Sequence, residues 1–281
     1  MQHSTTHQTT ARSLKIGVFD SGLGGLSVVR ALIDLIDQSA SPLIIDYVAD
    51  SNHAPYGEKS HHFIIERSKI ISNWLIERQI DVLVIACNTA TTHAISELRT
   101  QHPNLLIVGV EPGIKPASEQ TKTGYVGVIA TQATLNSARF KLLTQRHGSQ
   151  CQFICQVGHG WVEAVEQGHA NSHTDTQTLI RQVLEPINQS PADVLVLGCT
   201  HYPFLNHHIQ KIAPHYTVID TSNAIAQQVS RLVQNTIFPA VVIPPKAAQL
   251  NCFTTGSAQR MQSFLSYLKL AAQTQVSELA I

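Results

Sequence analysis

Short apolar runs rich in branched residues alternate along the chain with longer amphipathic segments. The first run, "LKIGVF" (14–19), predicts a strand and is followed by "DSGLGG", whose residues are typical of a turn. In the next segment the apolar positions recur at helical spacing, at Leu26, Val29, Ile33 and Ile36. The chain therefore opens with a predicted strand, turn and helix.

The same alternation continues to the end of the chain. The pattern predicts further strands at 43–50, 81–87 and 249–258, and helices at 63–79, 88–100, 224–235 and 259–270. Residues 124–143 show the same order of strand, turn and helix as residues 14–33. A loop is expected over 51–60 and a proline-bearing connector over 238–248. Strands that alternate with helices are typical of an α/β fold with a parallel sheet and helices on its faces.

The second half of the chain repeats the first. The segments "DVLVIACNTATTH" and "DVLVLGCTHYPFL" place Cys87 and Cys199 at equivalent positions, 112 residues apart. The first predicted strands of the two halves match at Gly17 and Gly127, 110 residues apart. Two matches at nearly one offset predict two similar parallel-sheet α/β lobes, related by a pseudo-twofold axis, with the active site in the cleft between them.

The repeat also predicts a domain organisation. Residues 112–222 form the second lobe, and 14–111 with 223–281 form the first, because the last segment is expected to return to the first lobe. The polar opening, residues 1–13, is expected to be a disordered tail.

Each repeated cysteine stands at the carboxyl end of a predicted strand, just before a helix. Sites form at this edge of open α/β sheets, and a helix N-terminus is expected to lower the pKa of a thiol from its reference value of ~8.5. A lone cysteine at such a position is more often part of the core. Two matched thiols facing one cleft favour catalysis, because inversion of a tetrahedral carbon needs an acid and a base on opposite faces. Cys87 and Cys199 thus predict a two-base racemase.

Three neighbouring features admit more than one role. Asp20, which with Ser21 ends the first strand, could orient Cys87, bind a substrate ammonium group or cap the following helix. His201 could share a proton with Cys199 or bond only to backbone. The glycines of "SGLGGLS" expose N–H groups that could hold a carboxylate.

Composition and charge argue against several classes of protein. The chain has 281 residues, 19 basic and 19 acidic side chains, and 43% hydrophobic residues. Zero net charge gives no electrostatic footprint for nucleic acid or a membrane surface. The opening has no secretory signal and no apolar run approaches the ~20 residues of a membrane span, so a cytoplasmic location is expected. Five cysteines without a CxxC pair argue against a disulfide framework.

Five motifs in order along the chain resemble the cofactor-independent aspartate/glutamate racemase family, and within it the glutamate racemases. They are "FDSGLGGLSV" (19–28), "PYGEKS" (55–60), "ACNTAT" (86–91), "GVIATQATLNS" (127–137) and "GCTHYP" (198–203). The resemblance implies an isomerase that interconverts L- and D-glutamate without cofactor or metal and supplies D-glutamate for peptidoglycan synthesis. Related aspartate racemases tend to carry Glu in place of His201, which favours glutamate as substrate.

The resemblance also implies roles for individual residues. Cys87 and Cys199 become the acid/base pair, assisted by Asp20 and His201 respectively. A further carboxylate is expected beside the histidine; "VEQG" favours Glu166, with Glu163 left open because the preceding residues depart from the family pattern. The positions that match substrate contacts are Asp20, Ser21, Tyr56, Gly57, Asn88, Thr89, Thr131, Thr134, Thr200 and His201. Family members suggest two further partners, a second copy in a homodimer and a peptidoglycan-precursor activator.

Three other functions compete with this one. The fold could serve a racemase or decarboxylase that acts on another acid, although decarboxylation needs only one proton donor. A metal site could use Cys199, His201 and the His207–His208 pair, but the chain has neither HExxH nor CxxC. A nucleotide-binding module is disfavoured because "GLGGLS" fails the GxGxxG pattern.

Overall fold

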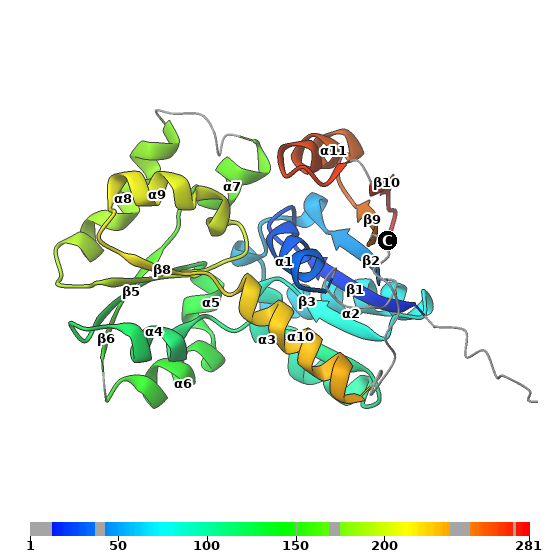
Figure 1. The fold of residues 1–281 in the computed structure, drawn as a ribbon, viewed down its shortest axis with the longest axis horizontal. Helices are drawn as coiled ribbons and strands as arrows, with labels where there is room; N and C mark the ends of the chain where they lie inside the picture. Colours follow the sequence, from blue (N-terminus) through cyan, green and yellow to red (C-terminus); the bar gives the residue numbers. More distant parts are fainter. Residues whose placement is uncertain (1–12, 37–42, 150, 169–174, 237–247, 272–273) are drawn as a thin grey trace, which may run out of the picture.

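The chain folds into two lobes, each built on a parallel β-sheet with helices on its faces (Figure 1). The computed structural model describes residues 13–36, 43–149, 151–168, 175–236, 248–271 and 274–281. The predicted two-lobed α/β fold is confirmed. The predicted tail at 1–13, except its last residue, and nearly all of the connector at 238–248 lie outside the described residues.

The first lobe holds a six-stranded sheet in the order β10-β9-β2-β1-β3-β4. Its strands are β1 (Leu14–Asp20), β2 (Leu43–Ala49), β3 (Val82–Ile85), β4 (Leu106–Gly109), β9 (Gln249–Thr254) and β10 (Thr274–Glu278). Its helices are α1 (Leu26–Ile36), η1 (Ser51–His53), η2 (Tyr56–Glu58), α2 (His61–Glu77), α3 (Asn88–Gln101), α10 (Ser222–Thr236) and α11 (Ala258–Tyr267). The central strands are buried on both faces, which explains their continuous apolar runs.

The second lobe holds a four-stranded sheet in the order β6-β5-β7-β8. Its strands are β5 (Tyr125–Ala130), β6 (Gln152–Val157), β7 (Val194–Gly198) and β8 (Thr217–Ile219). Its helices are α4 (Ile114–Gln120), α5 (Gln132–Asn136), α6 (Ala138–His147), α7 (Trp161–Glu166), α8 (Asp175–Asn188), η4 (Tyr202–Leu205) and α9 (Asn206–Ile212). This order matches β2-β1-β3-β4 of the first lobe strand for strand.

The strand register reproduces the repeat found in the sequence. Gly17 of β1 pairs with Leu83 of β3, and Gly127 of β5 pairs with Leu195 of β7. Both glycines leave room for the side chain of an isoleucine. A Cβ on Gly17 would lie 2.7 Å from the side chain of Ile80, which lies between α2 and β3, and a Cβ on Gly127 would lie 2.5 Å from that of Ile187 on α8. Each candidate cysteine follows the third strand of its lobe, so the two thiols occupy equivalent places in two copies of one topology.

The C-terminal segment lies against the first sheet. Helix α10 packs on α1, β9 pairs with β2, and β10 pairs with β9 at the edge of the sheet. Strands β4, β6, β8 and β10 are not among the predicted elements; β10, "TQVSE", has only one strongly apolar residue and takes its conformation from its pairing with β9.

The helical part of the predicted strand, turn and helix over 124–143 is not continuous. It is divided into α5 and α6, because Ser137 leaves the helical conformation and caps α6 by accepting a hydrogen bond from the amide of Phe140 at 3.1 Å.

Candidate active site

The predicted site residues come together where the two lobes meet, at the carboxyl ends of the parallel strands. Asp20 ends β1, Cys87 follows β3, Thr131 follows β5 and Cys199 follows β7. The exposed fraction of the Cys87 side chain is 5% and that of Cys199 is 8%. Gly57 is half-buried, and the remaining predicted residues are buried: Asp20, Ser21, Tyr56, Asn88, Thr89, Thr131, Thr134, Glu166, Thr200 and His201.

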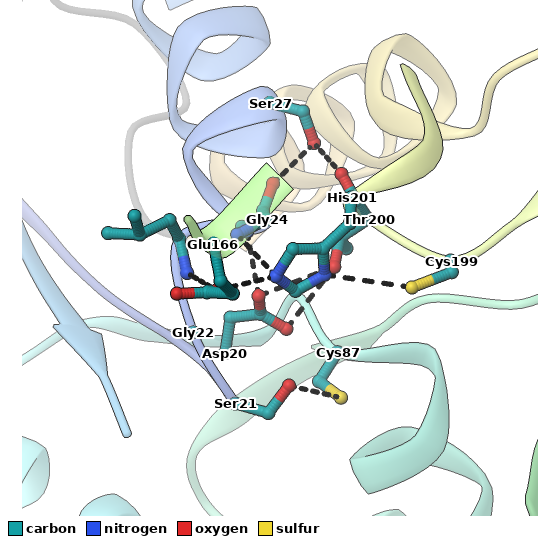
Figure 2. Close-up of polar contacts among 12 residues, drawn as sticks. Asp20, Ser21, Gly22, Gly24, Ser27, Cys87, Glu166, Cys199, Thr200 and His201 are labelled. Atoms are coloured by element: carbon teal, nitrogen blue, oxygen red, sulfur yellow. Dashed lines mark hydrogen bonds and ion pairs between the residues drawn. The ribbon is translucent and has the colours of Figure 1, made fainter. Parts of the chain in front are cut away.

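Cys87 lies at the N-terminus of α3 with two polar neighbours. Its sulfur accepts a hydrogen bond from the amide of Ala90 at 3.4 Å and thereby caps the helix. Its thiol donates to the hydroxyl of Ser21 at 3.6 Å (Figure 2). The backbone of α3 thus presents a positive helix end to this sulfur, as the sequence predicts.

The sequence predicts a lowered pKa for this thiol, but burial has the opposite effect. Burial raises the pKa of Cys87, and the nearby Asp20 carboxyl raises it further, while the Ala90 amide and Ser21 lower it only in part. The prediction of a lowered pKa is therefore wrong for Cys87 in this closed arrangement. The physical reason is that burial removes water from the sulfur, and loss of hydration disfavours the thiolate more than one helix end favours it. The raised pKa favours the protonated thiol at Cys87.

Cys199 lies at one end of a chain of three polar side chains. Its sulfur is 3.7 Å from Nδ1 of His201, and Nε2 of the same ring is 2.7 Å from Oε1 of Glu166 (Figure 2). The Gly24 amide also lies near Nε2, at 3.2 Å. We place a proton on Nε2 and let it be donated to Oε1 of Glu166, because that contact is the shorter of the two and charge-assisted hydrogen bonds are short. The Glu166 carboxylate therefore holds the His201 ring so that Nδ1 points toward the sulfur of Cys199.

The electrostatics of this chain favour a charged imidazole. Burial opposes the charge on His201, but the contacts with Cys199 and Glu166 outweigh it and hold the pKa of the ring well above its ordinary value. A protonated imidazole beside a sulfur donates to it and stabilises negative charge there. The two thiols thus have different partners: a carboxylate–imidazole chain at Cys199, and a serine hydroxyl with a helix end at Cys87.

The structure brings Glu166, rather than Glu163, to the histidine. Both lie on α7, and Glu166 ends the helix next to His201 and the backbone of Leu23. Glu163 instead lines a small hollow together with Tyr202 and Gly160.

Asp20 connects the turn before α1 with the second lobe. Its carboxylate accepts from the amide of Gly25 at 2.8 Å and lies 3.3 Å from the hydroxyl of Thr200. Burial raises the pKa of Asp20, partly opposed by the charge of His201. The bond to Gly25 is a capping interaction, one of the roles that the sequence allows, and the approach to Thr200 brings Asp20 to the junction of the lobes.

The glycine-rich turn receives the Glu166–His201 pair from the other lobe. The amide of Leu23 donates to Oε1 of Glu166 at 2.6 Å. A Cβ on Gly22 would lie 2.0 Å from that oxygen, and one on Gly24 would lie 2.4 Å from Nδ1 of His201. The turn holds two carboxylates of the protein, each through one N–H group: that of Leu23 donates to Glu166 and that of Gly25 to Asp20.

The fit at Gly22 leads to a first prediction. Replacing Gly22 by alanine should displace Glu166 from His201 and lower kcat/KM for racemisation by about 10-fold or more, as expected when a supporting charged hydrogen bond is lost. Steady-state kinetics on the purified variant would measure this, with the unfolding temperature as a check on folding. Unchanged kcat/KM would show that the close fit at Gly22 is not needed.

Three threonines and an asparagine line the junction between the lobes. The hydroxyl of Thr89 lies 2.9 Å from that of Thr131 and 3.3 Å from that of Thr134. The buried Nδ2 of Asn88 has no hydrogen-bond partner among the described residues. An unpartnered buried donor is costly, so this amide is available to a bound ligand.

The hydroxyl of Tyr56 is bonded within the first lobe. It donates to Asp50 at 2.6 Å, and Asp50 in turn pairs with Arg67 at 2.8 Å. Asp50 and Arg67 are not among the residues predicted from the sequence, nor is Tyr47, whose hydroxyl donates to the carbonyl of Gly22 at 2.5 Å. One feature of the sequence could have indicated Asp50, because it follows the second strand just as Asp20 ends the first.

Two other features bear on the alternatives. Within the described ranges, no group of three or more His, Cys, Asp or Glu side chains is placed to hold a metal ion. In the same part of the chain, no helix combines the length and the apolar character that crossing a membrane requires.

Known racemases resemble this chain both in sequence and in structure. The Asp/Glu/Hydantoin racemase family matches residues 16–229. The chain is 43% identical over 262 residues to the glutamate racemase of Ectopseudomonas mendocina, covering 93% of this chain and 96% of that protein. It is 42% identical over 262 residues to the glutamate racemase of Ralstonia pickettii, covering 92% of this chain and 89% of that protein.

Solved structures of similar proteins share the fold. A glutamate racemase isoform from Bacillus anthracis superposes with a TM-score of 0.83 at 27% identity, covering 97% of this chain and 99% of that one. The Escherichia coli glutamate racemase, in complex with L-glutamate and the activator UDP-MurNAc-ala, superposes with a TM-score of 0.81 at 30% identity, covering 96% of this chain and 99% of that one.

Proposed function

Since the chain belongs to the Asp/Glu/Hydantoin racemase family, and is therefore a racemase, we propose that it interconverts L- and D-glutamate by a two-base transfer of the Cα proton between Cys87 and Cys199. Its product, D-glutamate, would supply peptidoglycan synthesis in the cytoplasm. Glutamate is proposed because the curated relatives of nearly full coverage are glutamate racemases.

The observation that carries the mechanism is the equivalence of the two thiols. Cys87 follows β3 and Cys199 follows β7, the third strands of two sheets with the same strand order, and both sulfurs are buried where the lobes meet. A substrate held between the lobes would present one face of its Cα to each lobe. One thiolate takes the proton from one face while the opposite thiol gives a proton to the other, which inverts the centre.

The partners of each thiol suggest how the proton is managed. At Cys199, the His201 ring can keep the sulfur negative by donating from Nδ1, with Glu166 holding the ring in place. At Cys87 the raised pKa keeps the thiol protonated, which suits proton donation. After one turnover the protonation states of the two thiols are exchanged, and reaction in the opposite direction restores them.

The same residues can bind the substrate. The unpartnered Nδ2 of Asn88 and the threonine hydroxyls offer donors for a carboxylate, and Asp20 offers an acceptor for an ammonium group. Because both sulfurs are buried, the lobes must separate for glutamate to reach them. Asp20 in this scheme also orients Cys87, as the family resemblance implies.

Solvent deuterium incorporation at Cα tests the proposed function. The protein is incubated in D₂O with L- or D-glutamate, without added cofactor, and the product is followed by NMR, with aspartate as the control substrate. We expect deuterium mainly in the inverted product and only with glutamate, because a two-base enzyme delivers a solvent-derived proton to the opposite face. Exchange with retention would indicate a single base, and turnover of aspartate alone would reject glutamate as substrate.

The homodimer and the peptidoglycan-precursor activator stay predictions for this chain. The Escherichia coli relative was solved with an activator of that kind, UDP-MurNAc-ala. The deuterium experiment is therefore run with and without this compound.

A further inference from the structure

The carboxylate of Asp50, directly after β2, accepts hydrogen bonds from four side chains. Arg67 donates from Nε at 3.0 Å and from Nη2 at 2.8 Å, and the Tyr56 hydroxyl donates at 2.6 Å. Nδ1 of His53 lies at 2.9 Å and the Thr255 hydroxyl donates at 3.0 Å. These five residues are called the Asp50 cluster below. Its members come from η1, η2, α2 and the end of β9, so one carboxylate joins four segments.

The Asp50 cluster is charged and enclosed. Asp50 is fully buried, and the Arg67 side chain is 9% exposed. Burial alone raises the pKa of Asp50, but the hydrogen bonds from Arg67, Tyr56 and His53 outweigh it and hold the pKa below its ordinary value. The ion pair is therefore present at neutral pH, and its two-point contact with Arg67 fixes the orientation of the carboxylate.

The Asp50 cluster touches the active site on two sides. The amide of Asp50 donates to the carbonyl of Asp20 at 3.0 Å, which ties it to the first strand end. On the other side, η2 carries Gly57 against the second lobe, where a Cβ on Gly57 would lie 2.8 Å from Cβ of Thr131. Thr131 is itself bonded to Thr89 of the first lobe. The segment held by Asp50 therefore forms part of the junction that encloses the substrate.

We propose that Asp50, held by Arg67, is a positioning residue for racemisation, which sets η1 and η2 so that Tyr56 and Gly57 form a wall of the closed site. This proposal rests on the proposed function. Since the Tyr56 hydroxyl is bonded to Asp50, Tyr56 contributes its ring and backbone to that wall rather than a free hydroxyl group. A misplaced wall should weaken binding of either enantiomer, because it adjoins the substrate whichever thiol acts as the base.

The chain offers a matched control in Asp46. This residue lies on β2, the strand that Asp50 follows, and is fully buried; it pairs with Nε of Arg78 at 2.9 Å and with Nζ of Lys15 at 3.2 Å. It also accepts a hydrogen bond from Asn251 of β9 at 2.7 Å. These three partners lie on β1, directly after α2 and on β9, outside η1 and η2. Asp46→Asn therefore breaks a buried ion pair of the same kind without touching the wall of the site.

The test compares KM and kcat for L- and D-glutamate in Asp50→Asn, Tyr56→Phe and Asp46→Asn, together with unfolding temperatures. For Asp50→Asn we expect kcat/KM to fall by about 100-fold in both directions, mostly through KM, as for a misplaced substrate-binding wall. For Tyr56→Phe, which removes one hydrogen bond to a charged group, KM should rise by about 10-fold. Asp46→Asn should lower the unfolding temperature and leave KM within about twofold of the wild-type value.

The outcomes separate the two proposals. A wild-type protein that does not racemise glutamate overturns the proposed function itself. If the wild type is active but KM in Asp50→Asn and Tyr56→Phe stays as close to normal as in Asp46→Asn, the positioning role is rejected. If Asp50→Asn does not fold, Tyr56→Phe decides, because it leaves the Asp50–Arg67 pair in place.

Discussion

Replacing Cys87 or Cys199 by serine should abolish racemisation, with kcat falling by about 10³-fold or more, in the upper part of the range for a positioned general acid or base. A serine hydroxyl fills nearly the same space but is a far weaker acid than a thiol. Each variant still holds one thiol and should exchange the Cα proton of one glutamate enantiomer with retention, and the two variants should act on opposite enantiomers. Polarimetry measures the first effect, and NMR in D₂O measures the second.

Cys155 provides the control for this experiment. It is a free, half-buried thiol on β6, away from the lobe junction. Cys155→Ser should therefore racemise at the wild-type rate. Full racemase activity in either the Cys87 or the Cys199 variant would contradict the two-base mechanism, and exchange of the same enantiomer by both variants would contradict the assignment of one thiol to each face.

Replacing His201 by alanine should lower kcat by about 10²- to 10⁴-fold, and more strongly in the direction in which Cys199 abstracts the proton. The reason is that His201 contacts Cys199 at 3.7 Å, whereas Cys87 is bonded to Ser21 and Ala90. Glu166→Gln should show the same directional bias with a smaller loss, because Glu166 acts only through the ring. Separate rate measurements starting from L- and from D-glutamate give the ratio of the two directions.

His215 is a suitable control for the histidine experiment. It is exposed, lies between α9 and β8, and its ring packs against that of Tyr216. His215→Ala should leave both directions unchanged. An equal loss in the two directions for His201→Ala would argue that the ring serves the whole site, for example by holding the lobes together through Glu166 and Leu23, rather than Cys199 alone.

Much of the fold follows from local features of the sequence. Branched apolar runs and helical spacing depend only on neighbouring residues, so β1, β3 and α3 are predicted close to where they occur. The repeat is readable because duplicated strands keep the same spacing from glycine to cysteine. The strand ends that carry Asp20, Cys87 and Cys199 are determined by the same local patterns.

Other features depend on partners far along the chain. Strand β10 forms because β9 offers an edge, and its own sequence carries little strand signal. The choice between Glu163 and Glu166 also depends on residues far along the chain. Residues three apart on a helix lie near each other, so the sequence admits either, and only the docking of α7 against His201 and Leu23 selects Glu166.

The sequence by itself determined the two α/β lobes, the matched thiols at their strand ends and the polar residues around them, because each of these depends on short-range spacing. The tertiary structure decided the protonation of Cys87, the Cys199–His201–Glu166 chain and the Asp50 cluster. Hydration and hydrogen bonding at these groups depend on atoms from distant segments, such as the Leu23–Glu166 contact that spans 143 residues. Packing of these distant segments brings the atoms together, and at Cys87 the resulting burial outweighs the local effect of a helix end.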